Sequence, residues 1–425
     1  MTKDRKNSTP MNESKNKPTI TRRGFHRTMA AVFTAASARR VLGANDKINI
    51  GVIGCGGRSY AHIHTILKLI ESGANVAITA VCDIYRPRLE KAKAATNGQG
   101  TMRHEELLSF SNVDVVVAAG PDHWHGYHAL DAMNAGKDVY CEKPLCHWRQ
   151  TELPKRLVAT AKETKRLIQV GTQWMSNPAY AKAKQLIADG AIGKPIMAET
   201  GYYRVGDWGE RGMPIDDPNA KPGPDLDWER FLGDSPRREF DVSRVFRWRM
   251  YWDYAGGPAT DLYPHPFTPV AYMLDLDYPE CVVCTGGKHR YEEREVPDTC
   301  NMIIDYAGGL TVLVTGTQGN DYSAQGTALR PILRGWDGTL TFEENDIVIR
   351  PTEGSSIKEQ RIPADFGERF TEFWTTFLDC CRNRTQPKAN IELGAKVQIA
   401  MQMGIAALRG RRAVFFDRER QEIMD

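Results

Sequence analysis

A cluster of glycines directly after a short apolar run is the sequence feature that most restricts the fold of this 425-residue chain. The apolar run covers residues 48–53 and leads into Gly54-Cys55-Gly56-Gly57-Arg58-Ser59, after which apolar residues recur at helical spacing over 60–70. A strand, a glycine turn and a helix in this order are typical of a dinucleotide-binding fold. Gly54 and Gly56 would permit the tight turn and the close approach of a pyrophosphate, and a small serine replaces the third glycine.

An acidic residue at the end of the second predicted strand supports the same interpretation. Residues 76–82 are apolar and Asp83 follows them, at roughly the 20-residue spacing where such folds place an acid on the ribose hydroxyls. A carboxylate at this position repels a 2′-phosphate, so we expect NAD rather than NADP. Arg86 and Arg88 keep NADP open as the less favoured alternative. The other interpretation of Asp83 is an ordinary helix cap.

Strands and helices continue to alternate up to about residue 150. A third apolar run covers residues 113–119, a helix is expected over 127–135, and a further strand ends in Glu142-Lys143-Pro144. This alternation predicts a parallel, doubly wound sheet with ligands at the carboxyl ends of its strands. Pro144 has no N–H and stiffens the turn, so Lys143 projects from a strand end at the border between cofactor and substrate.

The second half of the chain has a different pattern. Residues 206–236 are crowded with Gly, Pro and Asp, which indicates a long loop over a site. Gly308-Gly309 and Asp337-Gly338 each separate two strand-like runs and predict hairpins. We therefore expect a Rossmann domain over residues 45–168 and an α/β substrate domain over 169–425, built on an open, mainly antiparallel sheet.

The first 44 residues are predicted to be a leader. Thr21-Arg22-Arg23-Gly24-Phe25 is a twin-arginine export signal, and the uncharged run over residues 28–38 is shorter than the roughly 20 residues that span a bilayer. We expect export to the periplasm by the twin-arginine machinery and no stable membrane span. The alternative is a basic, disordered N-terminus on a cytoplasmic protein.

Charge and cysteine content exclude two classes of site. Residues 1–40 hold ten Lys and Arg against two acids, so the rest of the chain is net acidic although the whole carries +3. A net acidic body does not attract phosphate backbones, and we expect no nucleic-acid partner. Cys281 and Cys284 form a C-x-x-C without a second pair at zinc spacing, so we expect buried free thiols and no metal site.

A second group of chemically active residues lies within residues 256–265. Asp261 and His265 are four positions apart, so on a helix they would share one face, where the carboxylate would make the imidazole more basic. The other interpretation is that His265 is a packed, hydrogen-bonded core residue. Pro264 and Pro266 oppose a regular helix at this point.

Together these residues resemble the Gfo/Idh/MocA oxidoreductase family. The resemblance depends on Gly54-Cys55-Gly56-Gly57, on Pro121-Asp122-His123-Trp124-His125, on Gly136-Lys137-Asp138-Val139 running into Glu142-Lys143-Pro144, and on Asp261 with His265. It implies that Lys143 is the active-site lysine, His265 the catalytic acid/base and Asp261 its partner. It also implies a cis Lys143–Pro144 bond and oligomer contacts through the open sheet, in a dimer or tetramer. The chain departs from the family at Thr268, where another aspartate is often found.

The resemblance further implies hydride transfer between NAD and a carbinol carbon of a sugar, inositol or related polyol. The residues expected to bind the cofactor are Gly54, Gly56, Gly57, Arg58, Asp83, Pro121, Trp124, His125, Glu142 and Lys143. The candidate substrate contacts are Tyr202, Tyr203, Arg204, Trp208 and Arg247.

Two alternative functions stay open. Free NAD is scarce outside the cytoplasm, so an exported enzyme is expected to hold its cofactor tightly and to reoxidise it within each turnover. This favours epimerisation, paired sugar oxidation and reduction, or glycoside cleavage through a transient keto-sugar, which some relatives perform. A non-catalytic dinucleotide sensor would need none of Lys143, Asp261 and His265, and all three are present.

Overall fold

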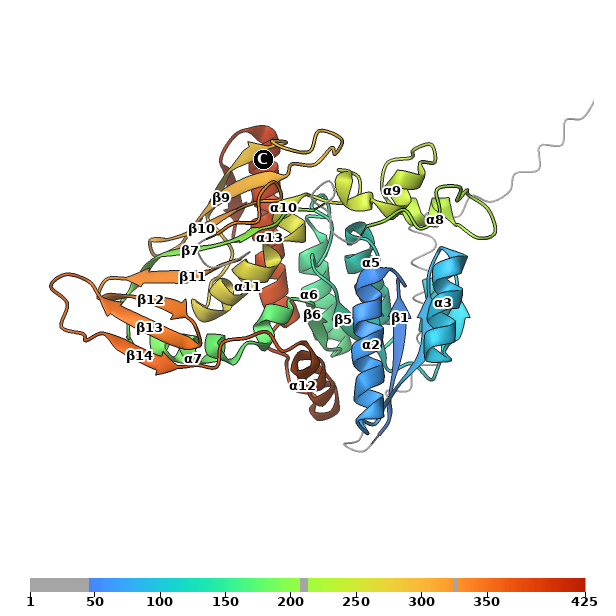
Figure 1. The fold of residues 1–425 in the computed structure, drawn as a ribbon, viewed down its shortest axis with the longest axis horizontal. Coiled ribbons are helices and arrows are strands. Elements are labelled where there is room, and N and C mark those ends of the chain that lie inside the picture. The colour runs from blue at the N-terminus through green and yellow to red at the C-terminus, as the bar shows by residue number, and fades with distance from the viewer. Residues whose placement is uncertain (1–45, 207–212, 324–327, 425) are drawn as a thin grey trace, which may run out of the picture. The chain divides into compact units, whose positions relative to one another are not determined.

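The computed structural model describes residues 46–206, 213–323 and 328–424 (Figure 1). The predicted leader and Trp208 lie outside these ranges. None of the helices in the described ranges has the length and apolar character that a membrane crossing requires. The predicted domain boundaries stay predictions.

The first half of the chain forms the parallel six-stranded sheet that the sequence predicts, in the order β3-β2-β1-β4-β5-β6. Its strands are continuous apolar runs because helices cover both faces, and Ile48, Ile50 and Val52 of the central strand are fully buried. The strands are β1 (Ile48–Ile53), β2 (Val76–Cys82), β3 (Gln99–Thr101), β4 (Val115–Ala118), β5 (Asp138–Cys141) and β6 (Ile168–Val170). The helices are α2 (Gly57–Glu71), α3 (Arg86–Thr96), α4 (His104–Ser109), α5 (Asp122–Asn134) and α6 (Leu153–Thr164). The strand order reverses between β1 and β4, where such sheets leave a crevice for ligands.

The second half forms a ten-stranded sheet in the order β14-β13-β12-β11-β7-β10-β9-β8-β15-β16. Every pairing in it is antiparallel except the parallel pair β7 and β10, and both predicted hairpins are present, β9–β10 and β11–β12. The strands are β7 (Pro195–Tyr203), β8 (Cys281–Gly287), β9 (Thr299–Tyr306), β10 (Leu310–Thr317), β11 (Ala328–Gly335), β12 (Gly338–Glu343), β13 (Asp346–Pro351), β14 (Gln360–Pro363), β15 (Val414–Asp417) and β16 (Glu422–Met424). The predicted fold class is confirmed.

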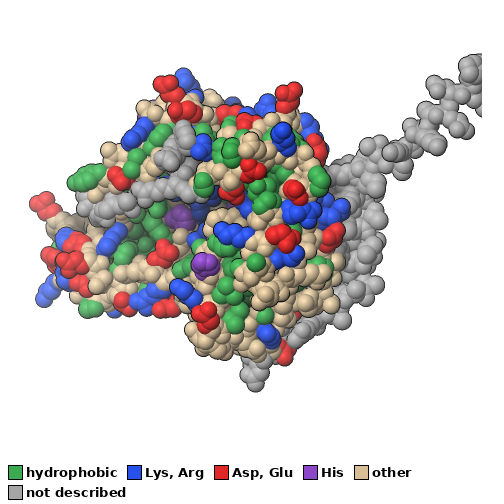
Figure 2. All heavy atoms as spheres, turned by 45° about the vertical axis from the view of Figure 1, so that its right-hand side comes forward, with side chains coloured by type: hydrophobic (Ala, Val, Ile, Leu, Met, Phe, Trp, Pro, Cys, Tyr) green, Lys and Arg blue, Asp and Glu red, His purple; other side chains and the backbone are tan. Residues whose placement is uncertain are grey.

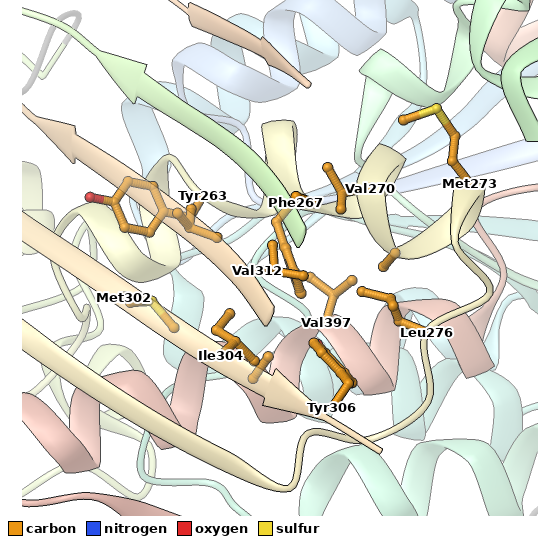
Figure 3. Close-up of a cluster of buried hydrophobic side chains, with 14 of the residues drawn as sticks. Tyr263, Phe267, Val270, Met273, Leu276, Met302, Ile304, Tyr306, Val312 and Val397 are labelled. Carbon is orange, nitrogen blue, oxygen red and sulfur yellow. The ribbon is translucent and has the colours of Figure 1, made fainter. Parts of the chain in front are cut away.

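Helices cover one face of this sheet and form the larger hydrophobic core. They are α7 (Pro178–Ala188), α11 (Pro264–Met273) and α13 (Ile391–Gly410). Phe267 and Val270 of α11 and Val397 of α13 meet Val312 and Ile304 of the sheet (Figure 3). Because α13 also contacts α6 and β6, it joins the second core to the first sheet.

Residues 213–255, here named the strap, overlap the long loop predicted over 206–236, and α8 (Trp228–Leu232) replaces part of that loop. The strap also contains α9 (Val242–Phe246) and the short 3₁₀ helix η3 (Trp248–Met250). Aromatic packing explains why the strap is ordered into helical segments. Trp228, Phe231 and Phe246 are buried in a small cluster of their own. Tyr85 of the first half belongs to the same cluster, so the strap is packed onto the Rossmann sheet.

A helix from the end of the chain also packs onto the first sheet. Helix α12 (Phe370–Asn383) places Phe373, Trp374 and Phe377 in the core that surrounds β1. The Trp374 ring is stacked on Tyr140 of β5 with the ring centres 4.6 Å apart. The hydrophobic core of the nucleotide half is therefore completed by residues more than 200 positions away in sequence.

Candidate active site

One cavity of about 480 Å³ lies at the carboxyl ends of the first sheet. All twelve predicted catalytic and cofactor-binding residues line it, together with residues of the strap and of the second half. Lys143 and His265, far apart in sequence, thus open onto the same space as the glycine turn. Their individual roles stay predictions.

The glycine turn has the geometry that a pyrophosphate site requires. Gly54 has φ +86°, and a Cβ placed there would lie 2.7 Å from the backbone of Ala119 and Gly120. Helix α2 begins directly after Gly56, so its first N–H groups face the cavity at the positive end of the helix. The residues present therefore fit a dinucleotide phosphate.

Asp83 anchors the glycine turn through its carboxylate. Its Oδ2 accepts a hydrogen bond from the Cys55 N–H at 2.6 Å and its Oδ1 accepts from the Tyr85 N–H at 2.8 Å. Helix α3 has no side-chain cap, so the alternative interpretation of Asp83 as a helix cap is wrong. Burial raises the pKa of Asp83, and Arg88 and the two N–H groups oppose that shift.

Arg86 and Arg88, which left NADP binding as an alternative, form ion pairs with carboxylates of the strap. Arg88 Nε lies 2.5 Å from Asp216 Oδ2, and its guanidinium lies 5.1 Å from the ring centre of Phe246. Arg86 Nε lies 2.7 Å from Asp225 Oδ1. The strap thus brings negative charge to the side of the cavity where a 2′-phosphate would lie.

Glu142 belongs to a buried hydrogen-bond network that the sequence did not reveal. Its Oε1 accepts from Arg58 Nε at 2.8 Å and from His62 Nε2 at 2.9 Å, and Trp374 Nε1 donates to His62 Nδ1 at 3.1 Å. An indole N–H only donates, so His62 carries its proton on Nε2. Burial raises the pKa of Glu142, but Arg58 and His62 outweigh burial and hold it well below its usual range. Nothing in the local pattern around His62 indicates this role.

His125 and Trp124 bind loops together at the edge of the cavity. His125 Nδ1 lies 2.8 Å from the Pro144 carbonyl and its Nε2 lies 2.7 Å from the Gly120 carbonyl, so the ring joins the turns after β4 and β5. Trp124 Nε1 donates to the Phe231 carbonyl of the strap at 2.9 Å.

Asp261 is the anion that holds three cationic side chains at the other end of the cavity. Lys143 Nζ donates to its backbone carbonyl and to Oδ1, the latter at 3.2 Å. Arg249 Nε lies 3.1 Å from Oδ1, and Arg204 Nη2 donates to Oδ2 at 3.1 Å. Burial raises the pKa of Asp261, but Lys143, Arg204 and Arg249 together lower it far below its usual range.

Asp261 and His265 lie on two separate helices, which agrees with the prediction that Pro264 and Pro266 oppose a regular helix through both residues. Helix α10 (Pro258–Asp261) ends at the aspartate and α11 starts at Pro264, which occupies the first helical turn and has no N–H to donate to the turn before it. His265 Nδ1 is buried and has no hydrogen-bond partner among the described residues. Burial, with Lys143 and Arg58 adding to it, lowers the pKa of His265 well below 6.5. The imidazole is therefore neutral near pH 7.

The candidate substrate contacts divide into two groups. Arg204 lines the cavity, and Tyr202 stacks on Trp174 next to His265, with the tyrosine and tryptophan ring centres 5.7 Å apart. The Tyr203 hydroxyl instead lies 2.8 Å from the hydroxyl of Thr315 outside the cavity lining, and Arg247 donates to the Met213 carbonyl. Arg249 and Gln173 line the cavity but were not predicted. No local motif marks either of them.

Two other sequence expectations concern partners and metals. In the space-filling view, acidic and basic side chains alternate over the face shown without one continuous basic area (Figure 2). In the part of the chain that the structure describes, no group of three His, Cys, Asp or Glu side chains is placed to hold a metal. Cys281 and Cys284 are half-buried, which corrects the expectation of fully buried thiols, since β8 exposes part of each side chain.

Two family models match nearly all of the described chain. One, described as an oxidoreductase family with an NAD-binding Rossmann fold, matches residues 48–172. The other, described as an oxidoreductase family C-terminal alpha/beta domain, matches residues 176–425.

Curated relatives align with the first half. The inositol 2-dehydrogenase/D-chiro-inositol 3-dehydrogenase of Lactiplantibacillus plantarum is 33% identical over 156 residues, which cover 36% of this chain and 43% of that protein. Inositol 2-dehydrogenase 2 of Saccharopolyspora erythraea is 37% identical over 163 residues, which cover 37% of this chain and 46% of that protein. The aligned segments span less than half of either relative.

Solved structures share the fold over both halves. A levoglucosan dehydrogenase in complex with NADH and levoglucosan has a TM-score of 0.66 at 18% identity and covers 87% of this chain and 99% of its own. The WlbA dehydrogenase from Bordetella pertussis, in complex with NADH and UDP-GlcNAcA, has a TM-score of 0.65 at 18% identity, with the same coverage.

Proposed function

Because this chain belongs to the Gfo/Idh/MocA oxidoreductase family, we propose that it transfers a hydride between NAD and a carbinol carbon of a sugar, inositol or related polyol. The observation that carries this proposal is the single cavity shared by the glycine turn, Lys143 and His265. Inositol dehydrogenases among the relatives and a levoglucosan dehydrogenase among the structures support a polyhydroxylated ring as substrate.

The chain's own residues would prepare the hydroxyl for oxidation. Neutral His265 would take the hydroxyl proton on Nε2, because its Nδ1 is buried without a hydrogen-bond partner among the described residues. Lys143, held in place by Asp261, would donate a hydrogen bond to the same oxygen and offset its developing negative charge. Bound NAD would supply the hydride acceptor, with its phosphates at Gly54 to Arg58 and a ribose near Asp83.

The test is to separate chemistry from binding. Replacing His265→Ala or Lys143→Met is expected to lower the turnover of sugars about 10²-fold or more while NAD still binds. Tyr203→Phe is the matched control, because its hydroxyl contacts Thr315 outside the cavity lining. If cells that carry the His265→Ala variant behave like wild-type cells, the result would instead favour a non-catalytic dinucleotide sensor.

A redox-neutral reaction with a retained cofactor is the second candidate, and the strap favours it. The strap packs its aromatic cluster against Tyr85, pairs Arg230 with Glu105 at 2.9 Å, and accepts hydrogen bonds from His123 and Trp124 at the Phe231 carbonyl. Because the strap forms one wall of the cavity, its packing would slow the release of a bound dinucleotide.

Two measurements distinguish the candidates. The nucleotide released on denaturing the purified protein identifies the cofactor, and we expect NAD because Arg86 and Arg88 face strap carboxylates. Cleavage of p-nitrophenyl glycosides without added NAD would support the redox-neutral reaction. The opposite result is an absorbance of NADH that increases only when NAD and a sugar are both added. That result would support a dehydrogenase whose cofactor dissociates after each turnover, and it would exclude a retained cofactor.

The open face of the ten-stranded sheet is proposed to bind a second copy of the chain. Val283, Ile303 and Phe415 on β8, β9 and β15 are 39–49% exposed, and Val283 and Ile303 are direct neighbours across the two strands. Adjacent exposed apolar side chains on a sheet are typical of an interface. Light scattering should give a dimer or tetramer, and Ile303→Lys should lower its mass to that of a monomer.

Export is proposed from the Thr21–Phe25 motif. Twin-arginine transport carries folded proteins, which suits a protein that must load its cofactor before it leaves the cytoplasm. Fractionation of cells is expected to place the protein in the periplasm, and the double substitution Arg22→Lys and Arg23→Lys is expected to retain it in the cytoplasm.

A further inference from the structure

Two cysteines on adjacent strands of the ten-stranded sheet lie outside the site described above. The Sγ atoms of Cys284 on β8 and Cys300 on β9 are 3.0 Å apart. Cys284 is directly opposite Met302, and side chains alternate between the faces of a strand. Cys284, Met302 and Cys300 therefore share one face, the face toward the hydrophobic core.

This contact changes the meaning of the C-x-x-C spacing. Cys281 and Cys284 both lie on β8, where residues three apart are separated by roughly 10 Å along an extended strand. That separation exceeds the reach of a disulfide, whose Cα atoms lie within about 7 Å. The sulfur partner of Cys284 is therefore across the sheet and not within the motif.

We propose that Cys284 and Cys300 form a disulfide when the protein meets an oxidising disulfide compound. Cys284 is half-buried and Cys300 is fully buried, so the reagent reaches Cys284 first. The Cys284 thiolate attacks one reagent sulfur, which forms a mixed disulfide and releases one reagent thiol. The Cys300 thiolate then attacks Cys284 Sγ and releases the second. Two cysteine thiols are oxidised, one reagent disulfide is reduced to two thiols, and the two cysteine protons pass to them.

The cross-link would restrain strand β9, which supports the segment that holds His265. Tyr263, two residues before His265, donates its hydroxyl to the Cys300 carbonyl and to the Gly316 carbonyl, the latter at 3.2 Å. Joining β8 to β9 at Cys300 therefore holds the support beneath α11. Closing a loop of about 15 residues is expected to raise the melting temperature by about 5 °C in a chain of this size.

Peptide mapping of the wild-type full chain tests the proposal directly. The protein is incubated with oxidised glutathione, its remaining thiols are alkylated under denaturing conditions, and its peptides are weighed without reduction. We expect the peptides that hold Cys284 and Cys300 to be joined, lighter than their sum by two hydrogen atoms, with Cys281 alkylated. Alkylation of both Cys284 and Cys300, a link to Cys281, or glutathione left on Cys284 would overturn the proposal.

Melting curves provide the second readout. Oxidation should raise the melting temperature of the wild type and of the control Cys281→Ser. It should leave the melting temperatures of Cys284→Ser and Cys300→Ser unchanged. An equal rise in all four proteins would also overturn the proposal, because the stabilisation would then come from another site.

Discussion

The protonation state of His265 sets the pH dependence that we expect of the reaction. Burial, with Lys143 and Arg58, lowers the pKa of the imidazole well below 6.5, so the ring stays a neutral proton acceptor down to that pH. The kcat/KM for oxidation should be constant from about pH 8 to 6.5 and fall only in more acidic solution, where the ring becomes protonated. A midpoint near neutral pH, measured with a saturating cofactor, would contradict this environment for His265.

Asp261 links charge in the site to the stability of the fold. Its pKa in the folded state is depressed relative to the usual value near 4, so its carboxylate stabilises the protein above about pH 4. This contribution is lost as the pH falls through the folded pKa. Asp261→Asn is expected to lower the free energy of unfolding by about 3 kcal/mol at pH 7, because it leaves Lys143, Arg204 and Arg249 without their shared anion.

Urea denaturation at two pH values measures this effect. The difference in unfolding free energy between wild type and Asp261→Asn should shrink below about pH 4, where the carboxylate is protonated in the unfolded state but still ionised in the folded protein. Asp275→Asn is a suitable control, because that carboxylate is 81% exposed. A difference that is independent of pH would show that packing, and not charge, is responsible.

At the scale of single residues, the sequence predicts which side chains share the cavity but not how they are bonded. Lys143 and His265 were identified by motif. The partners of Asp261 come from other elements, since Arg204 directly follows β7 and Arg249 lies on η3 of the strap. Spacing along the chain does not encode such contacts. His62 and Trp374 were missed for the same reason, since their hydrogen bond joins residues 312 positions apart.

Among the elements, the strap carries a prediction about cofactor release. Phe246 is buried against Tyr85, with the ring centres 5.3 Å apart, and lies under Arg88. Phe246→Ala should weaken the packing of the strap by about 3 kcal/mol and speed the release of bound nucleotide by tenfold or more. Release is measured by gel filtration followed by absorbance at fixed times. The control Phe240→Ala removes a partly exposed ring outside the cavity lining, and equal release from both variants would contradict the role of the strap.

Elements with a strong local signal were predicted correctly, and the others were not. Gly54 and the two hairpin turns each have a short-range cause, a positive φ or a tight turn, that the sequence states directly. Residues 206–236 were expected to be a loop because their Gly, Pro and Asp content concealed α8, one of the three short helical segments of the strap. Those segments are held by aromatic packing against Tyr85, which no local pattern reveals.

For the whole molecule, the packing of α12 predicts that the nucleotide half is not an independent unit. A fragment of residues 46–172 would expose the apolar surface that Phe373, Trp374 and Phe377 cover in the full chain. We expect this fragment to bind NAD poorly and to aggregate, as measured by light scattering and isothermal titration. Adding residues 366–390 through a flexible linker should restore solubility. A fragment that is monomeric and binds NAD unaided would contradict this prediction.

The late position of α12 in the sequence also orders events during synthesis. A ribosome releases the glycine turn early, but the helix that covers the back of that sheet emerges only when most of the chain has been made. A nascent chain therefore holds an unfinished nucleotide half until residues 370–383 have been made. Stable binding of the dinucleotide is thus expected only after α12 has emerged, and a chaperone that shields the uncovered face before then would act on α2 and β5.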